Sequence, residues 1–214
     1  MIGQKPEARR RATSAPPTTL AWKRRASHAD RSREIFRSLG LVLRERGVAS
    51  LTMQEIAGRL GITKGNLYYY FRDKQDLLYR CHLACMKLSL RALEESRRSP
   101  KGPAERLREL LRRHIRAITD EVYGAVMLTD LESLAPAQQR PYIAMRDRFE
   151  RGIRALIREG IERGEFREVD ARLAGFAVLG AINWIPKWYS PNGSLSAAAI
   201  AEAFADFLVA ALET

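Results

Sequence analysis

The stretch ITKGNLYYYF, residues 62–71, gathers the side chains with the most distinctive chemistry in the sequence. It holds three adjacent tyrosine hydroxyls, a lysine amine, an asparagine carboxamide and a glycine that leaves the backbone bare. The chemistry these groups share is hydrogen bonding. If the stretch is helical, the three rings cannot all lie in the core, so the surface they face becomes the central question.

A helical projection at about 100° per residue answers it. The positions that turn inward are Thr63, Leu67 and Phe71. The positions that point away from the core are Gly65, Asn66 and Tyr69. We expect Tyr68 and Tyr70 on the two flanks. The outward face therefore offers hydroxyl-bearing rings, an amide and exposed backbone.

Such a face suits double-stranded DNA. Asn66 can form paired hydrogen bonds with an adenine edge in the major groove, and Gly65 lets the helix approach the bases closely. The tyrosine hydroxyls, Lys64 and the free N–H groups of helix starts can donate to phosphates. Lys74, just beyond the stretch, is placed for a further phosphate.

The elements that must position this face are two short helices. Thr52 and Glu55 form a capping box in the sequence T-M-Q-E, which predicts a helix start. Gly61 permits a sharp turn, and Thr63 caps a further helix that runs to about Tyr70. With a preceding helix over residues 31–46, ended by Gly47, this is a helix-turn-helix layout.

The distribution of charge along the sequence also favours DNA as the partner. The chain carries a net charge of +12, and residues 1–80 hold 17 Lys and Arg against 7 Asp and Glu. The N-terminal third is therefore the part suited to a polyanion. Residues 1–27, rich in Ala, Pro, Ser, Thr and Arg, are expected to be a disordered basic arm. This arm either enters the minor groove or acts only through counterion release.

The remainder indicates helices without a strand pattern, so we predict an all-α fold. We place the helix-turn-helix domain at residues 28–74 and a helical domain at 75–214. Asp73 begins a long helix with an inward stripe, Pro141 begins another, and Asp170 caps an apolar helix to Ile185. A final helix starts near Leu195. The predicted inward stripe is Leu77, Cys81, Cys85, Leu88 and Ala92.

The stretch from Arg33 to Leu78 resembles the DNA-binding domain of TetR-type transcriptional regulators. The matching residues are Ile35, Phe36, Gly47, Leu51, Thr52, Ile56, Ala57 and the run LGITKGNLYYYFRDKQDLL. The DNA contacts that the resemblance implies are Thr52, Gln54, Thr63, Lys64, Gly65, Asn66, Tyr68, Tyr69, Tyr70 and Lys74. Where such proteins often have His as the third aromatic residue, this chain has Tyr70, which keeps a phosphate donor but removes a possible charge.

The resemblance also implies a homodimer whose last two helices pair across a two-fold axis. The segment 173–185 is too apolar to be exposed, and its small residues allow a close helix approach. These small residues are Ala174, Ala177, Gly180 and Ala181. The matching stripe of the final helix is Ile200, Phe204, Phe207 and Leu208. A dimer would hold its two reading helices about 34 to 36 Å apart, one turn of DNA.

A small hydrophobic effector is expected to bind between the C-terminal helices and shift the long helix. The lining candidates are Cys85, Leu88, His114, Ile118, Met127, Tyr142, Phe149, Asn183 and Trp184. His114 could instead be a satisfied core histidine. The segment INWIPKWYSPNG looks like its counterpart in regulators of fatty-acid or aromatic-acid catabolism, several of which respond to acyl-CoA thioesters. Alternatively, its aromatic residues brace the dimer. Basic residues available for a thioester are Arg146, Arg154 and Lys187.

Other classes fit less well. The sequence lacks the common hydrolase, metalloprotease and phosphate-loop motifs, so we expect no enzyme, no cofactor and no metal site. Membrane association through the arm lacks an apolar anchoring face, and the uncharged run 173–186 is short for a bilayer. Cys81 and Cys85 suit the inner face of a helix in a reduced, cytoplasmic protein. A ligand-independent helix-turn-helix or architectural DNA-binding protein remains the alternative.

Overall fold

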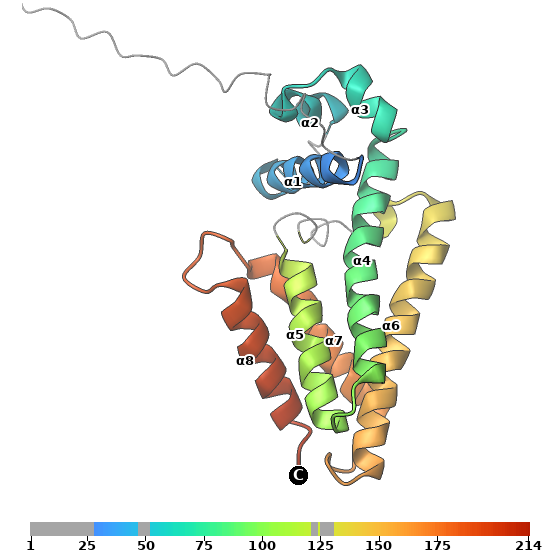
Figure 1. Cartoon of the computed structure of the whole chain (residues 1–214), viewed down its shortest axis with the longest axis vertical. Helices are drawn as coiled ribbons and strands as arrows, with labels where there is room; N and C mark the ends of the chain where they lie inside the picture. The colour runs from blue at the N-terminus through green and yellow to red at the C-terminus, as the bar shows by residue number, and fades with distance from the viewer. Residues whose placement is uncertain (1–27, 47–51, 121–123, 125–130) are drawn as a thin grey trace, which may run out of the picture.

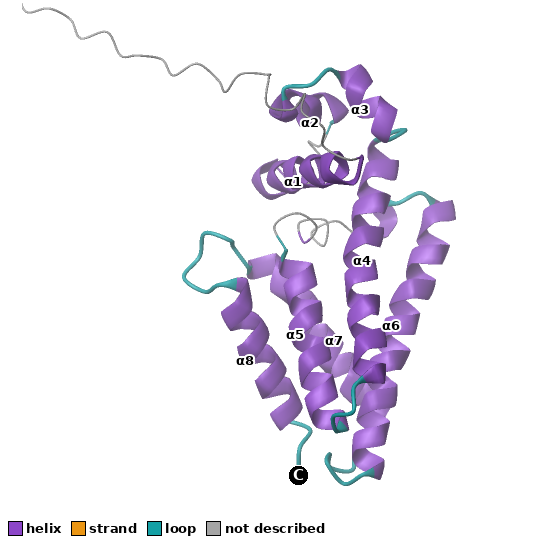
Figure 2. Cartoon of the chain, viewed as in Figure 1, coloured by secondary structure: helices purple, strands orange, loops and turns teal. Residues whose placement is uncertain are grey.

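The computed structural model describes residues 28–46, 52–120, 124 and 131–214. The predicted arm, Gly47, Leu51 and Met127 lie outside these residues. The described part is built from α-helices and one short 3-10 helix, with no named strand, as Figures 1 and 2 show. The prediction of an all-α fold is therefore confirmed. In chain order the elements are α1 (His28–Arg46), α2 (Met53–Leu60), α3 (Lys64–Tyr70), α4 (Lys74–Arg98), α5 (Pro103–Thr119), η3 (Leu131–Ser133), α6 (Pro136–Glu162), α7 (Ala171–Trp188) and α8 (Ala197–Ala210).

The predicted caps of the two short helices are present. The Thr52 N–H donates to Glu55 Oε2 at 3.1 Å, and the Glu55 N–H donates to Thr52 Oγ1 at 3.2 Å. Gly61 ends α2 with a φ of 62°, in the left-handed region that glycine adopts without strain. Thr63 Oγ1 then accepts the Asn66 N–H at 3.2 Å and starts α3. Local hydrogen bonds thus fix where both helices begin and how the chain turns between them.

The first three helices lie at one end of α4 (Figure 1), and their buried side chains belong to the same hydrophobic core as those of the later helices. Ile35, Ile56 and Leu67, one from each helix, are each at most 1% exposed. The rings of Phe36 in α1 and Phe71 at the end of α3 lie 5.6 Å apart between centroids. This core sets the rotation of α3 and therefore which of its residues face outward.

Below this block, α4 continues into a helical bundle in which α5 is central. Helix α5 packs against α4, α6, α7 and α8, and α6 packs against both α4 and α7. The inward side chains of α5 include Leu107, Leu110 and Leu111, none of which is exposed. The predicted domain boundary after Lys74 falls in the first turn of α4, so a single helix serves both parts of the chain.

Several predicted helix ends are wrong. Helix α6 begins at Pro136 rather than Pro141, because Pro136 fits the first helical position and Gln138 Oε1 accepts the Ala135 N–H at 3.2 Å. Pro141 lies inside the second turn. Helix α7 continues through Pro186 to Trp188. Ser196 caps α8 and starts it two residues after the predicted position.

No helix of the described residues is both long enough and apolar enough to cross a bilayer.

Candidate DNA-binding face and effector cavity

The outward face of α3 has the orientation that the helical projection predicts. Tyr69 is 79% exposed and Tyr68 is 44% exposed, whereas Leu67 is fully buried. The neighbouring positions Lys64, Gly65 and Asn66 are also exposed. Thr63 was predicted to turn inward but is exposed as well, because it is the N-cap residue and its backbone is extended rather than helical. Lys64 Nζ lies 5.7 Å from the centroid of the Tyr68 ring, which holds the amine beside the hydroxyl-bearing face. Hydrogen-bonding groups of different kinds are thus collected on one side of a two-turn helix.

Tyr70 departs from the prediction that it lies on an exposed flank. Its side chain is buried, only 7% exposed, and its hydroxyl accepts a hydrogen bond from Arg31 Nη1 at 3.0 Å. The Tyr69 ring meets the Tyr70 ring edge-on at 5.1 Å. A projection of α3 alone could not predict this burial, because the residue that covers this flank belongs to α1. Tyr70 therefore links α3 to α1 through its hydroxyl and packs against the Tyr69 ring.

The remaining predicted DNA contacts come from α2 and α4. Gln54 is exposed in the first turn of α2, which contacts α3. The Thr52 hydroxyl is exposed but already bonded, since it also donates to Glu55 Oε2 at 3.0 Å. Lys74 is the first residue of α4 and is half-buried. The structure thus brings these predicted residues to the ends of neighbouring helices.

A buried aspartate joins α3 to α4. Asp76 is 5% exposed and accepts the Arg72 N–H and the Arg80 Nε–H, both at 3.1 Å. The Asp76 N–H itself donates to the capping carboxylate of Asp73 at 2.7 Å. The Arg80 guanidinium also lies over the Phe71 ring, 5.4 Å from its centroid. Sequence reasoning missed this joint, although the i, i+4 spacing of Asp76 and Arg80 is a signal for it.

A cavity of about 570 Å³ lies among α4, α5, α6 and α7, beside η3. Its lining residues are Met86, His114, Leu131, Tyr142, Ile143, Arg146, Asp147, Phe149, Glu150, Phe176, Leu179, Gly180 and Asn183. Of the predicted ligand residues, the cavity brings together His114, Tyr142, Phe149 and Asn183. Three charged residues of α6 supply its ionic part, and most of the remaining lining is apolar or aromatic.

The other predicted ligand residues lie elsewhere. Cys85 and Ile118 are in the core, where the Cys85 thiol donates to the Ala117 carbonyl oxygen at 3.5 Å. Leu88 was predicted to lie on the inward stripe of α4, but it is 38% exposed and faces a different groove. Trp184 is 64% exposed and lies outside the cavity lining. Helical periodicity identified the inner faces of α4 and α5, but the packing of α6 and α7 decided which positions on them border a void.

The deep polar groups of the cavity are neutral at pH 7. Burial lowers the pKa of His114 to about 4. Burial, with a smaller effect of Arg146, likewise lowers the pKa of His82 to about 4, and burial raises the pKa of Tyr142 to about 12. The His82 and Tyr142 rings meet at 5.0 Å, which links the cavity wall to the first half of α4. This deep part of the cavity favours an uncharged, largely apolar ligand group, whereas Arg146, Asp147 and Glu150 supply charge elsewhere in the lining.

Comparison with known proteins agrees with the geometry. The family described as "Tetracyclin repressor-like, C-terminal domain" matches residues 100–212, and "Bacterial regulatory proteins, tetR family" matches residues 42–81. The chain belongs to the TetR family. Its members are transcriptional regulators with an N-terminal helix-turn-helix, which is the layout described above.

Within the TetR family, the chain is similar to KstR2, PfmR and AibR. The HTH-type transcriptional repressor KstR2 of Mycobacterium tuberculosis is 28% identical over 178 residues, which cover 80% of this chain and 87% of KstR2. The crystal structure of PfmR from Thermus thermophilus is 35% identical, covers 84% of this chain and 99% of PfmR, and has a TM-score of 0.75. AibR, solved with isovaleryl coenzyme A and operator DNA, is 27% identical, covers 86% of this chain and 98% of AibR, and has a TM-score of 0.71.

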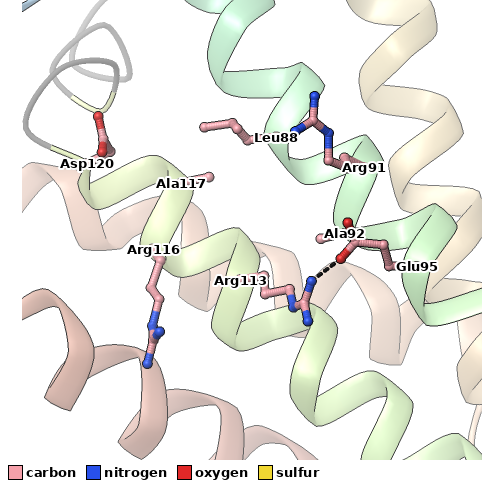
Figure 3. Close-up of a pocket in the computed structure, with 8 residues that line it drawn as sticks. All are labelled: Leu88, Arg91, Ala92, Glu95, Arg113, Arg116, Ala117 and Asp120. Atoms are coloured by element: carbon pink, nitrogen blue, oxygen red, sulfur yellow. Dashed lines mark hydrogen bonds and ion pairs between the residues drawn. The ribbon is translucent and has the colours of Figure 1, made fainter. Parts of the chain in front are cut away.

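This TetR-family chain has a second groove between α4 and α5, shown in Figure 3. Its volume is about 300 Å³, and Arg113 from α5 pairs with Glu95 from α4 across it. Arg113 also pairs with Glu109 at 2.8 Å, and Arg116 pairs with Glu202 at 3.3 Å. Because five of its eight lining residues are charged, this groove is the weaker candidate for a hydrophobic effector.

The TetR-family chain also exposes large apolar side chains on its last two helices. These are Leu173, Phe176, Trp184, Trp188 and Phe207, of which Phe207 is 73% exposed. The small residues Ala177 and Gly180 are exposed on the same helix as Phe176. Ile200, predicted to belong to this stripe, is instead buried at 3% exposure, because α8 turns that side toward α5.

Among the described residues, no group of three His, Cys, Asp or Glu side chains is placed to hold a metal ion.

Proposed function

We propose that the chain is an effector-responsive, DNA-binding repressor that acts as a homodimer in the cytoplasm. The observation that carries this proposal is the outward face of α3. Its inner edge is fixed by the buried Leu67, and Asn66 and the 79% exposed Tyr69 face outward in the reading helix of a helix-turn-helix. Exposed groups on a rigid, short helix are what a major-groove reader requires.

Within this proposal the residues of the face divide by role. Asn66 hydrogen-bonds to a base edge, and Gly65 allows the helix to come close. The groups that hold phosphates are Gln54, Lys64, Tyr68, Tyr69 and Lys74. Thr52 and Thr63 act indirectly, because they cap α2 and α3. The excess of basic over acidic residues in positions 1–80 favours the approach to DNA.

The exposed apolar surface of α7 and α8 supports a homodimer through these helices. Side chains as large as Trp184 and Phe207, 64% and 73% exposed in the single chain, are covered when two copies meet. A two-fold dimer would place two α3 helices about 34 to 36 Å apart and read a palindromic operator. A single copy has only one reading helix, so dimerisation would supply much of the affinity and the selection of half-site spacing.

The cavity supports control by a small, largely apolar effector. Tyr142 in its wall contacts His82, which lies on α4 two turns after Lys74. An effector that spreads α6 from α4 would pivot α4 and, through the Asp76 joint, the attached α3. Such control requires that the effector bind the arrangement with α4 pivoted and the DNA-binding arrangement with different affinities. AibR, whose structure contains isovaleryl coenzyme A, supports an acyl-CoA-type metabolite, and Arg146 is available beside the cavity.

The alternative is a ligand-independent DNA-binding or architectural protein with the same helix-turn-helix. A solidly packed C-terminal domain would favour that alternative, whereas a cavity of about 570 Å³ with an apolar lining favours effector control.

Selection of bound DNA from a random pool, followed by binding with a panel of acyl-CoA thioesters, tests the proposal. We expect a palindromic site and weaker binding in the presence of one thioester class. Asn66→Ala should relax sequence preference at one position of each half-site. Lys64→Ala should weaken all sites alike and reduce the dependence on salt. Binding that is indifferent to sequence would contradict the proposal and favour the architectural alternative.

A further inference from the structure

His114 lines the effector cavity with one ring nitrogen bonded and the other not. Its Nδ1 lies 2.7 Å from Ser89 Oγ, on the neighbouring helix α4. Its Nε2, on the other side of the ring, is buried and has no hydrogen-bond partner among the described residues. The residue is only 5% exposed, and Ser89 does not border the cavity. The unpaired nitrogen is therefore the polar atom that His114 has left to offer a ligand.

The contacts of Ser89 indicate which nitrogen carries the proton. Its hydroxyl has two possible acceptors, the Cys85 carbonyl oxygen at 3.5 Å and His114 Nδ1 at 2.7 Å. Donation to Nδ1 is the stronger choice, because 3.5 Å is the outer limit of a hydrogen bond. Burial lowers the pKa of His114 to about 4, so at pH 7 the ring holds a single proton. If Nδ1 accepts from Ser89, that proton is on Nε2.

The surroundings of this donor are largely apolar. The Phe149 ring packs against the His114 ring at 4.4 Å, and Met86 and Leu179 also line the cavity. Within such a setting an unpaired N–H is unfavourable, and an acceptor oxygen on a ligand relieves that cost whereas an alkyl group does not. A full negative charge is disfavoured at this neutral donor, because burying an unpaired carboxylate is costly.

We propose that the His114 Nε2–H group is the polar anchor of the effector cavity and selects apolar effectors that carry a carbonyl oxygen. The proposal rests on the proposed role of this cavity as the effector site and adds the residue that recognises the carbonyl oxygen of the effector. Ser89 acts as a positioning residue, since its hydroxyl fixes the tautomer and the orientation of the ring. The carbonyl oxygen then accepts the hydrogen bond while the attached chain occupies the apolar part of the cavity.

A matched pair of probes tests this assignment on the full chain without DNA. S-Ethyl butanethioate is a thioester, and butyl ethyl sulfide is the corresponding thioether, in which a CH₂ group replaces the only carbonyl group. We expect calorimetry to give about tenfold tighter binding of the thioester, the value of one good hydrogen bond. His114→Phe keeps an aromatic ring against Phe149 but removes the donor, so it should bring the two affinities together. Met86→Leu is the control, because it alters the cavity wall and should change both affinities alike.

The tautomer provides a second measurement that needs no ligand. The ¹⁵N chemical shifts of His114 in the free protein at pH 7 should show a protonated Nε2, and Ser89→Ala should shift this balance. Equal affinity for the two probes, no binding of either at millimolar concentration, or a protonated Nδ1 would each overturn the proposal. A thioester preference without any effect on DNA binding would leave the carbonyl anchor intact and refute the proposed regulation instead.

Discussion

Tyr69 and Tyr70 are adjacent residues with opposite environments, and the same substitution separates their roles. Tyr69→Phe removes an exposed hydroxyl, so it should lower DNA affinity about fivefold and leave folding stability unchanged. Tyr70→Phe removes the acceptor of the Arg31 hydrogen bond at 3.0 Å and should cost about 1 kcal/mol of stability. Urea unfolding and DNA titration of both variants check this. Loss of DNA affinity in Tyr70→Phe at full stability would show that Tyr70 meets DNA directly.

Two buried histidines make stability depend on pH. Burial lowers the pKa of both His82 and His114 from 6.5 to about 4. Between these values the unfolded chain binds protons that the folded chain does not, so stability is complete above about pH 6.5 and falls toward pH 4. The loss should approach roughly 2 to 3 kcal/mol for each histidine. Urea unfolding at pH 7, 6 and 5 measures it, and His82→Gln should flatten the dependence by about half.

At the scale of elements, the contact between α4 and α6 has no room for one more carbon atom. A Cβ at Gly152 would lie 2.5 Å from both methyl carbons of Leu93, which is fully buried. Gly152→Ala should therefore destabilise the protein by about 1 to 2 kcal/mol, despite the gain in helix propensity. Gly58 in α2 has nothing within 4 Å, so Gly58→Ala should stabilise by about 0.5 to 1 kcal/mol. Thermal unfolding compares the two, and stabilisation by Gly152→Ala would mean that Leu93 can move aside.

The same contact bears on regulation, because α4 links the cavity to the reading helix. Leu93 and Gly152 hold the distal half of α4 against α6, whereas Asp76 fixes its first turn to the end of α3. In the proposed mechanism, a displacement of α4 at the cavity would therefore be transmitted toward α3 rather than absorbed at the distal end.

At the scale of the whole molecule, the exposed apolar side chains of α7 and α8 predict assembly into a dimer. Phe207→Glu places a charge on a position that is 73% exposed in the single chain, so the fold should persist while the dimer dissociates. DNA affinity for a palindrome should then fall by at least tenfold. Leu88→Glu, on α4 at the other groove, is the matched control and should remain dimeric. Sedimentation velocity measures both, and an intact Phe207→Glu dimer would exclude this surface.

Much of the fold was determined by local sequence. Thr52, Glu55, Gly61 and Thr63 placed both short helices correctly, because caps and glycine turns depend on hydrogen bonds within a few residues. The outward orientation of Tyr69 followed from helical periodicity once Leu67 was assigned to the core. Pro141 misled the prediction of α6, since a proline signals a helix start but does not exclude a position inside the second turn.

Only the tertiary structure decided which faces are covered and where a void remains. Tyr70 is buried because α1 crosses the end of α3, and Ile200 is buried because α5 packs on that side of α8. The cavity collects His114 and Tyr142 but not Cys85 or Trp184, since its walls come from four helices whose spacing no single helix specifies. Periodicity gives the direction of a side chain relative to its own helix axis, whereas burial and cavities depend on the other helices that pack against it.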